Sequence, residues 1–306
     1  MSKDVKIFFD KNTWSDVARL PENERQQLID GVKKAQESYG LVIHFTPVNV
    51  FELLKSVKDD ESFKLCQTEL KIAAPLTNVH LLEHPWDHVK RGAVELVALE
   101  PPGLDNSFLQ LMRIIVKANT YSEVKPLVEE LRSRIVDFQK NWLVLTKETI
   151  QKIKESLKSA KLDLKKLTSL ENRPARLKDL WSSFRQHFRL QDAEFGQLDW
   201  GTVNSRLPSF RYWSQIQINY MDRLLLLGHS PKESDYFDIE QTIYFDIMDY
   251  LISDDKKLRT LVEEAKEPQL QGRVLSVEEF RLNILTLKKK AVSSCSSKWV
   301  ELSGKK

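Results

Sequence analysis

The chain has 306 residues, 41% of them hydrophobic and 30% charged, with a net charge of +3, which is typical of a folded globular protein with a sizeable core. No apolar run approaches the roughly 20 residues of a membrane helix and no signal peptide opens the chain, so we expect neither a membrane-spanning nor a secreted protein. The cysteines Cys66 and Cys295 lie far apart, which argues against a disulfide scaffold and favours a cytoplasmic protein.

The first part of the chain alternates between strand and helix patterns. Short apolar runs predict strands, and helices are expected where a capping residue or a proline opens a polar-apolar repeat. In chain order, we expect a strand at 5–9, a short helix capped by Asn12 or Thr13, a helix at 21–39 ended by Gly40, a strand at 41–45, and a helix from Pro47. This alternation is typical of an α/β sheet with parallel pairing.

The middle of the chain has helical periodicity and no convincing strand from about residue 60 to 228. Its clearest helices are 126–145, which opens with Pro126, and 149–167, and this succession predicts a helical hairpin or bundle. Residues 140–189 contain 13 Lys or Arg and 5 Asp or Glu, a net charge of +8. Such a segment suits a phosphate-binding surface, and the alternative is an ordinary solvated helix face.

The alternation of helix and strand returns after Gly228. In chain order, we expect a helix at 238–249 with Ile239, Ile243 and Ile247 on one stripe, a strand at 250–253, a helix at 257–265, a strand at 273–275, and a helix begun by Ser276 and Glu279 at capping-box spacing. Residues 293–306 are expected to form a flexible tail. The α/β pattern therefore occupies the two ends of the chain.

Acidic residues gather at one edge of the expected sheet. They are Asp10 after the first strand, Glu52 in the helix after the second, Asp238 at the start of the helix before the third, and Asp255 just beyond the third. Ligands of open parallel sheets bind outside the carboxyl ends of the strands, so we expect these side chains to lie together. Neighbouring carboxylates repel one another unless a cation neutralises them, and oxygen ligands suit Mg²⁺ or Mn²⁺.

Two alternatives stay open for these acids. Asp254 and Asp255 cannot be separated by pattern alone, so either could be the fourth acid. All of the acids could also be helix caps and surface positions, which are common places for Asp and Glu.

The acids lie in stretches with a characteristic order. KIFFDKNTW contains Asp10, HFTPVNVFELL contains Glu52, and DIEQTIYFDIMDYLISDDKKL contains Asp238 and Asp255, with Ser253 two residues before the last acid. In these stretches and in the closing GRVLSVEEF, the chain resembles the PIN-like nuclease family, with its four acids matched in order and a Ser or Thr common at the position of Ser253.

The resemblance covers roughly residues 3–58 and 232–285. It implies a three-layer α/β/α fold with a central parallel sheet. We therefore expect a discontinuous PIN-like domain of residues 1–58 and 230–292, interrupted by an all-α helical insertion at 59–229. The insertion is far larger than in compact members of the family.

The family also implies hydrolysis of phosphodiester bonds in RNA, less often in DNA, with Mg²⁺ or Mn²⁺ as cofactor. The metal ligands and catalytic residues would be Asp10, Glu52, Asp238 and Asp255. A metal-activated water would attack the phosphorus, and the metal would absorb the developing charge. The helical insertion would bind the nucleic acid or a regulatory protein partner.

Further contacts to nucleic acid are expected beside the acids and in the insertion. They are Lys11, Asn12 and Ser253, together with Arg211 from the aromatic- and arginine-rich stretch 206–223. Aromatic and arginine side chains stack on bases and bind phosphates, and the alternative for this stretch is core packing of a helix.

Two other classes of protein remain as alternatives. One is a non-catalytic PIN-like binding module, in which the α/β part is a scaffold and the insertion binds a partner protein or nucleic acid. All four acidic positions are filled, which favours the enzyme. The other is a purely helical structural protein, which predicts little strand content.

Overall fold

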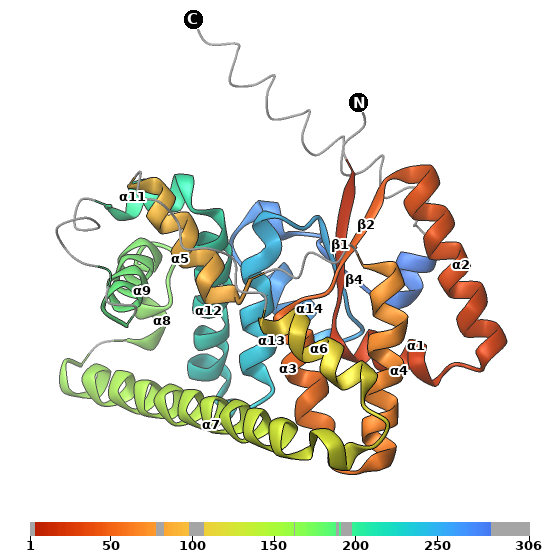
Figure 1. Ribbon diagram of the computed structural model, residues 1–306. Coiled ribbons are helices and arrows are strands. Elements are labelled where there is room, and N and C mark those ends of the chain that lie inside the picture. Colours follow the sequence, from red (N-terminus) through yellow and green to blue (C-terminus); the bar gives the residue numbers. More distant parts are fainter. Residues whose placement is uncertain are drawn as a thin grey trace, which may run out of the picture.

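The computed structural model describes residues 4–77, 83–97, 107–161, 163–187, 190 and 198–282 (Figure 1). Most of these residues are helical, and the two ends of the chain meet in one small sheet. None of the described helices is both long and apolar enough to cross a membrane. The predicted tail at 293–306 lies outside the described residues.

The sheet has four strands, all parallel, in the order β2-β1-β3-β4. They are β1 (Val5–Phe9), β2 (Leu41–His44), β3 (Tyr250–Ile252) and β4 (Val274–Leu275). All four strands agree with the predicted ones to within one residue at each end, so the α/β class with a parallel sheet is confirmed. The central strand β1 is an almost fully buried apolar run, as expected for a strand covered on both faces.

Three helices follow in the first part of the chain: α1 (Lys11–Arg19), α2 (Glu22–Tyr39) and α3 (Pro47–Ser56). Asp10 caps α1, accepting a hydrogen bond from the Thr13 amide, so the prediction of Asn12 or Thr13 as the cap was wrong. The chain is still extended at Asp10, where a short side chain can reach the free amides of the first turn. Gly40 ends α2 with a φ of 66°, which only glycine adopts at low cost.

The middle of the chain is helical, as expected. Its helices are α4 (Asp60–Leu76), α5 (Pro85–Leu96), α6 (Ser107–Lys117), α7 (Tyr121–Ser159), α8 (Leu164–Leu167), α9 (Arg173–His187), α11 (Trp200–Arg206) and α12 (Pro208–Leu227). The predicted division into two helices at 126–145 and 149–167 was wrong, because one helix of 39 residues, α7, runs through the first range and through the second as far as Ser159. No Gly or Pro separates the two segments, and Thr146 between them is buried, so nothing breaks the helix there.

The last described part contains α13 (Asp235–Glu240), the 3₁₀ segments η1 (Gln241–Asp246) and η2 (Pro268–Leu270), and α14 (Lys256–Glu263). The predicted α-helix at 238–249 is therefore replaced after residue 240 by a tighter 3₁₀ turn. Residues 241–245 are all buried, so burial is not confined to the single stripe that an α-helix would need. Ser276 and Glu279 form the predicted capping box at the start of a helix that is described as far as residue 282.

The main hydrophobic core joins the sheet to helices from all parts of the chain. It contains the strand residues Ile7, Phe8 and Ile43 as well as Val128 of α7 and Ile216 of α12. A second core lies among α5, α9, α11 and the start of α12. The helices between β2 and β3 thus pack directly on the α/β part, and the proposed boundaries at 59 and 229 stay a prediction.

Candidate functional site

The strand order places a topological switch point between β1 and β3. The connection after β1 leads to β2 on one side of the sheet, and the connection after β3 leads to β4 on the other. Where neighbouring connections leave in opposite directions, a crevice forms outside the carboxyl ends of the two strands, and ligands of α/β proteins bind there. Asp10 follows β1 directly and Asp255 follows β3 after two residues, so both lie at this crevice.

Asp10 is held from both sides of its carboxyl group. Its side chain is only 6% exposed. One oxygen accepts the Thr13 amide at 2.7 Å and lies 2.7 Å from the Thr13 hydroxyl, and the other accepts the Ser253 hydroxyl. Burial raises the pKa of Asp10, the charge of Asp255 adds to the rise, and the hydrogen bonds from Ser253 and Thr13 oppose it.

Ser253 links the two strand-borne acids. Its side chain is 1% exposed, and the hydroxyl that donates to Asp10 also accepts the Asp255 amide at 3.1 Å. Asp255 caps α14 by accepting the Leu258 amide at 2.9 Å. Asp254 is exposed and instead accepts the Val277 amide beyond β4, so Asp255 is the better candidate for the fourth acid. Ser253 holds these acids and presents no hydroxyl to solvent.

Glu52 and Asp238 come from helices. Glu52 lies on α3 and is half-buried. Desolvation, and then the charge of Asp10, raise its pKa to about 8, although the charges of Lys11 and Lys55 act to lower it. Asp238 lies on α13 and is also half-buried. Its pKa is raised well above the ordinary value, first by desolvation and then by the charges of Glu52, Asp255, Asp235 and Asp10. The sequence-predicted acids therefore share one electrostatic neighbourhood.

The four acids have the side-chain type that binds divalent cations, although these side chains are not arranged as ligands of one ion. Among the residues that the structure describes, no group of three or more Asp, Glu, His or Cys side chains is arranged to hold a metal ion. Asp10 and Asp255 are turned toward their own helix amides. The donors are nevertheless all carboxylates, desolvation and their mutual repulsion raise the pKa values of Asp10, Glu52 and Asp238, and oxygen ligands are what Mg²⁺ and Mn²⁺ prefer.

The helix α7 links the helix that carries Glu52 to the segment just before the helix that carries Asp238. Its Gln139 is 1% exposed, accepts a hydrogen bond from Lys55 of α3 and donates one to the carbonyl of Glu233, just before α13, at 3.2 Å. Lys55 also lies 3.9 Å from the Glu233 carboxylate. Figure 1 shows α7 running beneath α3, α13 and α12, and it packs against all three.

Thr13, Asn49 and Gln139 were missed at the sequence level. The Asn49 amide donates to the Phe9 carbonyl at 2.9 Å and fixes α3 to β1, and the Thr13 hydroxyl lies 3.1 Å from the Ile252 carbonyl at the end of β3. Thr13 stands three residues after Asp10 and Asn49 three after Thr46, the spacing of a helix cap. Gln139 is a polar residue on the buried face of a long amphipathic helix, which also signals an internal partner.

The structure places some of the expected nucleic-acid contacts beside the acids and others away from them. Lys11 is half-buried beside Glu52, and Asn12 is exposed one residue further on. Arg211 is not brought to the acids: it bonds to Gln269 at 2.8 Å and to Tyr212. The Tyr212 ring lies 5.9 Å from the guanidinium of Arg273, which precedes β4, so Arg211 lies toward the opposite edge of the sheet.

The basic segment is partly surface and partly internal. The lysines of the second half of α7 are exposed: Lys140, Lys147, Lys152, Lys154 and Lys158. Further along, Arg173 bonds to Gln215 and Arg176 pairs with Asp222 at 2.6 Å, so both arginines brace α9 against α12. The exposed α7 lysines, with the exposed Lys161, Lys165, Lys166 and Lys178 further along the segment, therefore offer a surface for phosphates, and Arg173 and Arg176 do not.

Comparisons with known proteins leave the site to be interpreted from its own geometry. No family model, no curated protein and no solved structure matches this chain.

Proposed function

We propose that the protein is a Mg²⁺- or Mn²⁺-dependent nuclease of the PIN-like kind, with a three-layer α/β/α domain, that hydrolyses RNA, or else DNA, in the cytoplasm. The observation that carries the proposal is the electrostatic coupling of Asp10, Glu52, Asp238 and Asp255 at the switch point of a parallel sheet. Carboxylates with raised pKa values in one crevice are typical of functional sites rather than of helix caps alone.

In this proposal the four acids hold the cation. When bound, the cation supplies charge neutralisation at the phosphate and a more acidic water. Ser253 and Thr13 orient Asp10, and Ser253 also sets the position of Asp255 through its amide. Because Glu52, with its pKa raised to about 8, must lose its proton to become a ligand, binding of the cation releases protons near neutral pH.

The chain would bind its substrate through cations on either side of the crevice. Lys11 lies beside Glu52, and the exposed α7 lysines continue the positive surface on the helix that packs against α3 and α13. Backbone phosphates would be bound there without reading of sequence. Ser253 and Arg211, whose side chains are engaged internally, would support the structure instead of contacting nucleic acid.

A non-catalytic module is the second candidate. The exposed α7 lysines favour it, since their surface does not depend on the acids and is suited to nucleic acid or an acidic protein partner.

Cleavage of labelled single-stranded RNA and DNA, with Mn²⁺, with Mg²⁺ and with chelator, tests the proposal. The native chain would be compared with an Asp10→Asn/Asp255→Asn variant, in which both caps keep an acceptor oxygen, and with Asp254→Asn as the matched control. We expect metal-dependent cleavage that is lost in the double variant and kept in the control. Absence of cleavage by the folded native chain under every condition would instead favour the binding module.

A further inference from the structure

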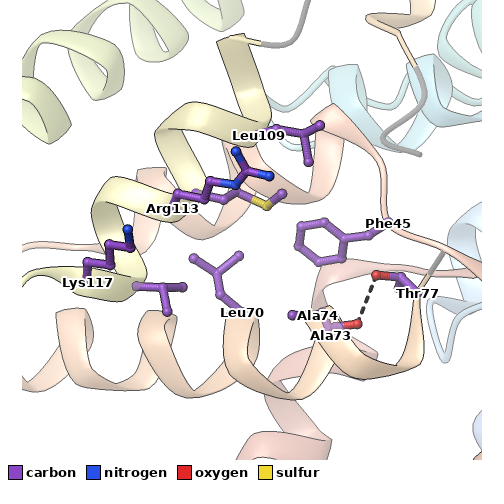
Figure 2. Close-up of a pocket in the computed structure, with 10 residues that line it drawn as sticks. Phe45, Leu70, Ala73, Ala74, Thr77, Leu109, Arg113 and Lys117 are labelled. Carbon is purple, nitrogen blue, oxygen red and sulfur yellow. Dashed lines mark hydrogen bonds between the residues drawn. The ribbon is translucent and has the colours of Figure 1, made fainter. Parts of the chain in front are cut away.

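An apolar cavity lies between α4 and α6, apart from the acidic crevice (Figure 2). Its volume is about 240 Å³. The wall includes Phe45 after β2, Leu70 of α4, and Met112 and Val116 of α6. None of the four proposed catalytic acids lines it. A role of the cavity is therefore independent of the proposed nuclease site.

The charged side chains of the lining are all positive. Apart from Thr77, whose hydroxyl donates to the Ala73 carbonyl at 2.9 Å, its polar side chains are two cations, Arg113 and Lys117, and no acid is among them. These two residues are one turn apart on α6 and are exposed. In the part of the chain that the structure describes, neither cation forms an ion pair. The cavity therefore combines an apolar interior with positive charge at its rim.

The size of the cavity limits the ligand. At about 30 Å³ for each water-sized group, its volume corresponds to about eight such groups, the size of a short hydrocarbon chain. Ligand pockets are mostly apolar, with a few charged groups that fix orientation. Water in contact with this wall gains few hydrogen bonds, so an apolar chain is the favoured occupant. The two rim cations favour a negative head group.

We propose that this cavity binds a small amphiphile with an unbranched chain of about eight carbons and a single anionic head group such as a carboxylate. The chain lies against Phe45 and Leu70, and the head group lies at Arg113 and Lys117. Figure 2 shows Arg113 on the α6 side of the cavity, across from Ala73 and Ala74 of α4.

Calorimetric titration with octanoate, octylammonium and octanol tests this site in the full chain. These probes share a chain length and differ in head-group charge. We expect 1:1 binding of octanoate, at least tenfold tighter than that of octylammonium, with octanol in between. In Arg113→Gln/Lys117→Gln the preference for octanoate over octylammonium falls below threefold. In Lys64→Gln/Lys71→Gln, a matched pair of exposed α4 lysines outside the lining, the preference is unchanged.

A second variant tests the place of binding. Ala74 is exposed on α4 and lines the cavity, so Ala74→Phe puts a ring into the cavity with little risk to the core. We expect this variant to keep the thermal midpoint of the native chain and to lose binding of all three probes. Equal binding of octanoate and octylammonium, octanoate binding that survives Ala74→Phe, or no binding to the folded native chain would each overturn the proposal.

Discussion

The two strand-borne acids and the two helix-borne acids are held by different parts of the chain. Asp10 and Asp255 follow adjacent strands, and the hydroxyl of Ser253 joins them. Glu52 and Asp238 lie on helices, and Gln139 of α7 links α3 to the segment just before α13. The strand-borne half of the candidate site is therefore held by the sheet, and a helix from the middle of the chain connects the elements that carry the other half.

The largest effect is expected at the sheet. Asp10→Ala removes the cap of α1 and leaves the buried hydroxyl of Ser253 without its acceptor. Loss of a cap costs about 1 kcal/mol and an unsatisfied buried polar group about 1–3 kcal/mol, so we expect the free energy of unfolding to fall by about 2–4 kcal/mol. Asp10→Asn keeps one acceptor oxygen for the cap of α1 and replaces the acceptor of the Ser253 hydroxyl by an amide nitrogen, so it should cost less than Asp10→Ala. Urea unfolding measures both, and an equal loss in the two variants would contradict the role of these hydrogen bonds.

A somewhat smaller effect is expected at α7. Gln139→Leu removes one of the two hydrogen bonds that the Glu233 carbonyl accepts, the other coming from the Tyr236 amide at 3.4 Å, and it also removes the bond from Lys55. At about 0.5–1.5 kcal/mol for each hydrogen bond, we expect the free energy of unfolding to fall by about 1–3 kcal/mol. Gln151→Leu, on the exposed side of the same helix, should change it by less than about 0.5 kcal/mol. If α7 positions the acids, Gln139→Leu also weakens Mn²⁺ binding while Gln151→Leu does not. Unchanged Mn²⁺ affinity in the Gln139 variant would mean that α7 only adds stability.

The burial of Glu52, together with the charge of Asp10, predicts a pH dependence of stability without metal. The folded chain keeps the proton of Glu52 up to about pH 8, whereas the unfolded chain loses it near the ordinary value of 4.5. The contribution of Glu52 to stability is thus fully present below pH 4.5 and is lost as the pH rises toward 8. In chelator, Glu52→Gln should raise the urea midpoint at pH 8 and leave it unchanged at pH 4.5. A midpoint that falls at pH 8 would show that the Glu52 carboxylate is stabilised by neighbours.

The smallest effect on stability is expected on the surface of α7. Lys147 and Lys154 are exposed, so replacing either by Gln should change the free energy of unfolding by less than about 0.5 kcal/mol. If both contact phosphates, the double variant weakens RNA binding and lowers the slope of log affinity against log salt by about 2. An unchanged slope would place the nucleic acid elsewhere.

The success and failure of sequence-based prediction follow the same division. The strands and the acids behind them were predictable because VKIFF and YLIS are short apolar runs ending near acids, and parallel topology puts their ends at one edge. The continuity of α7 was not, since two helices joined by a short turn and one long helix share the same periodicity. The cap at Asp10 was missed because Asp10 was assigned only to the metal site.

Long-range partners set the limits of the prediction. The link from Gln139 to α3 and α13 spans 84 and 94 residues in sequence, and no local pattern identifies such partners. Arg211 was predicted to contact phosphates because it lies in an aromatic- and arginine-rich stretch, and its contacts with Tyr212 and Gln269 hold it toward the other edge of the sheet. No local pattern indicates these internal partners of its guanidinium.

Calorimetric titration with Mn²⁺ near pH 7, in two buffers of different ionisation enthalpy, tests the central claim most directly. Glu52, whose pKa is raised to about 8, holds its proton in the metal-free chain at this pH, so a site built from the four acids releases protons when it binds the cation. We predict Mn²⁺ binding with proton release by the native chain, and neither by the folded Asp10→Asn/Asp255→Asn variant. Absence of Mn²⁺ binding by the native chain, or equal binding by the variant, would contradict a metal site at this edge of the sheet.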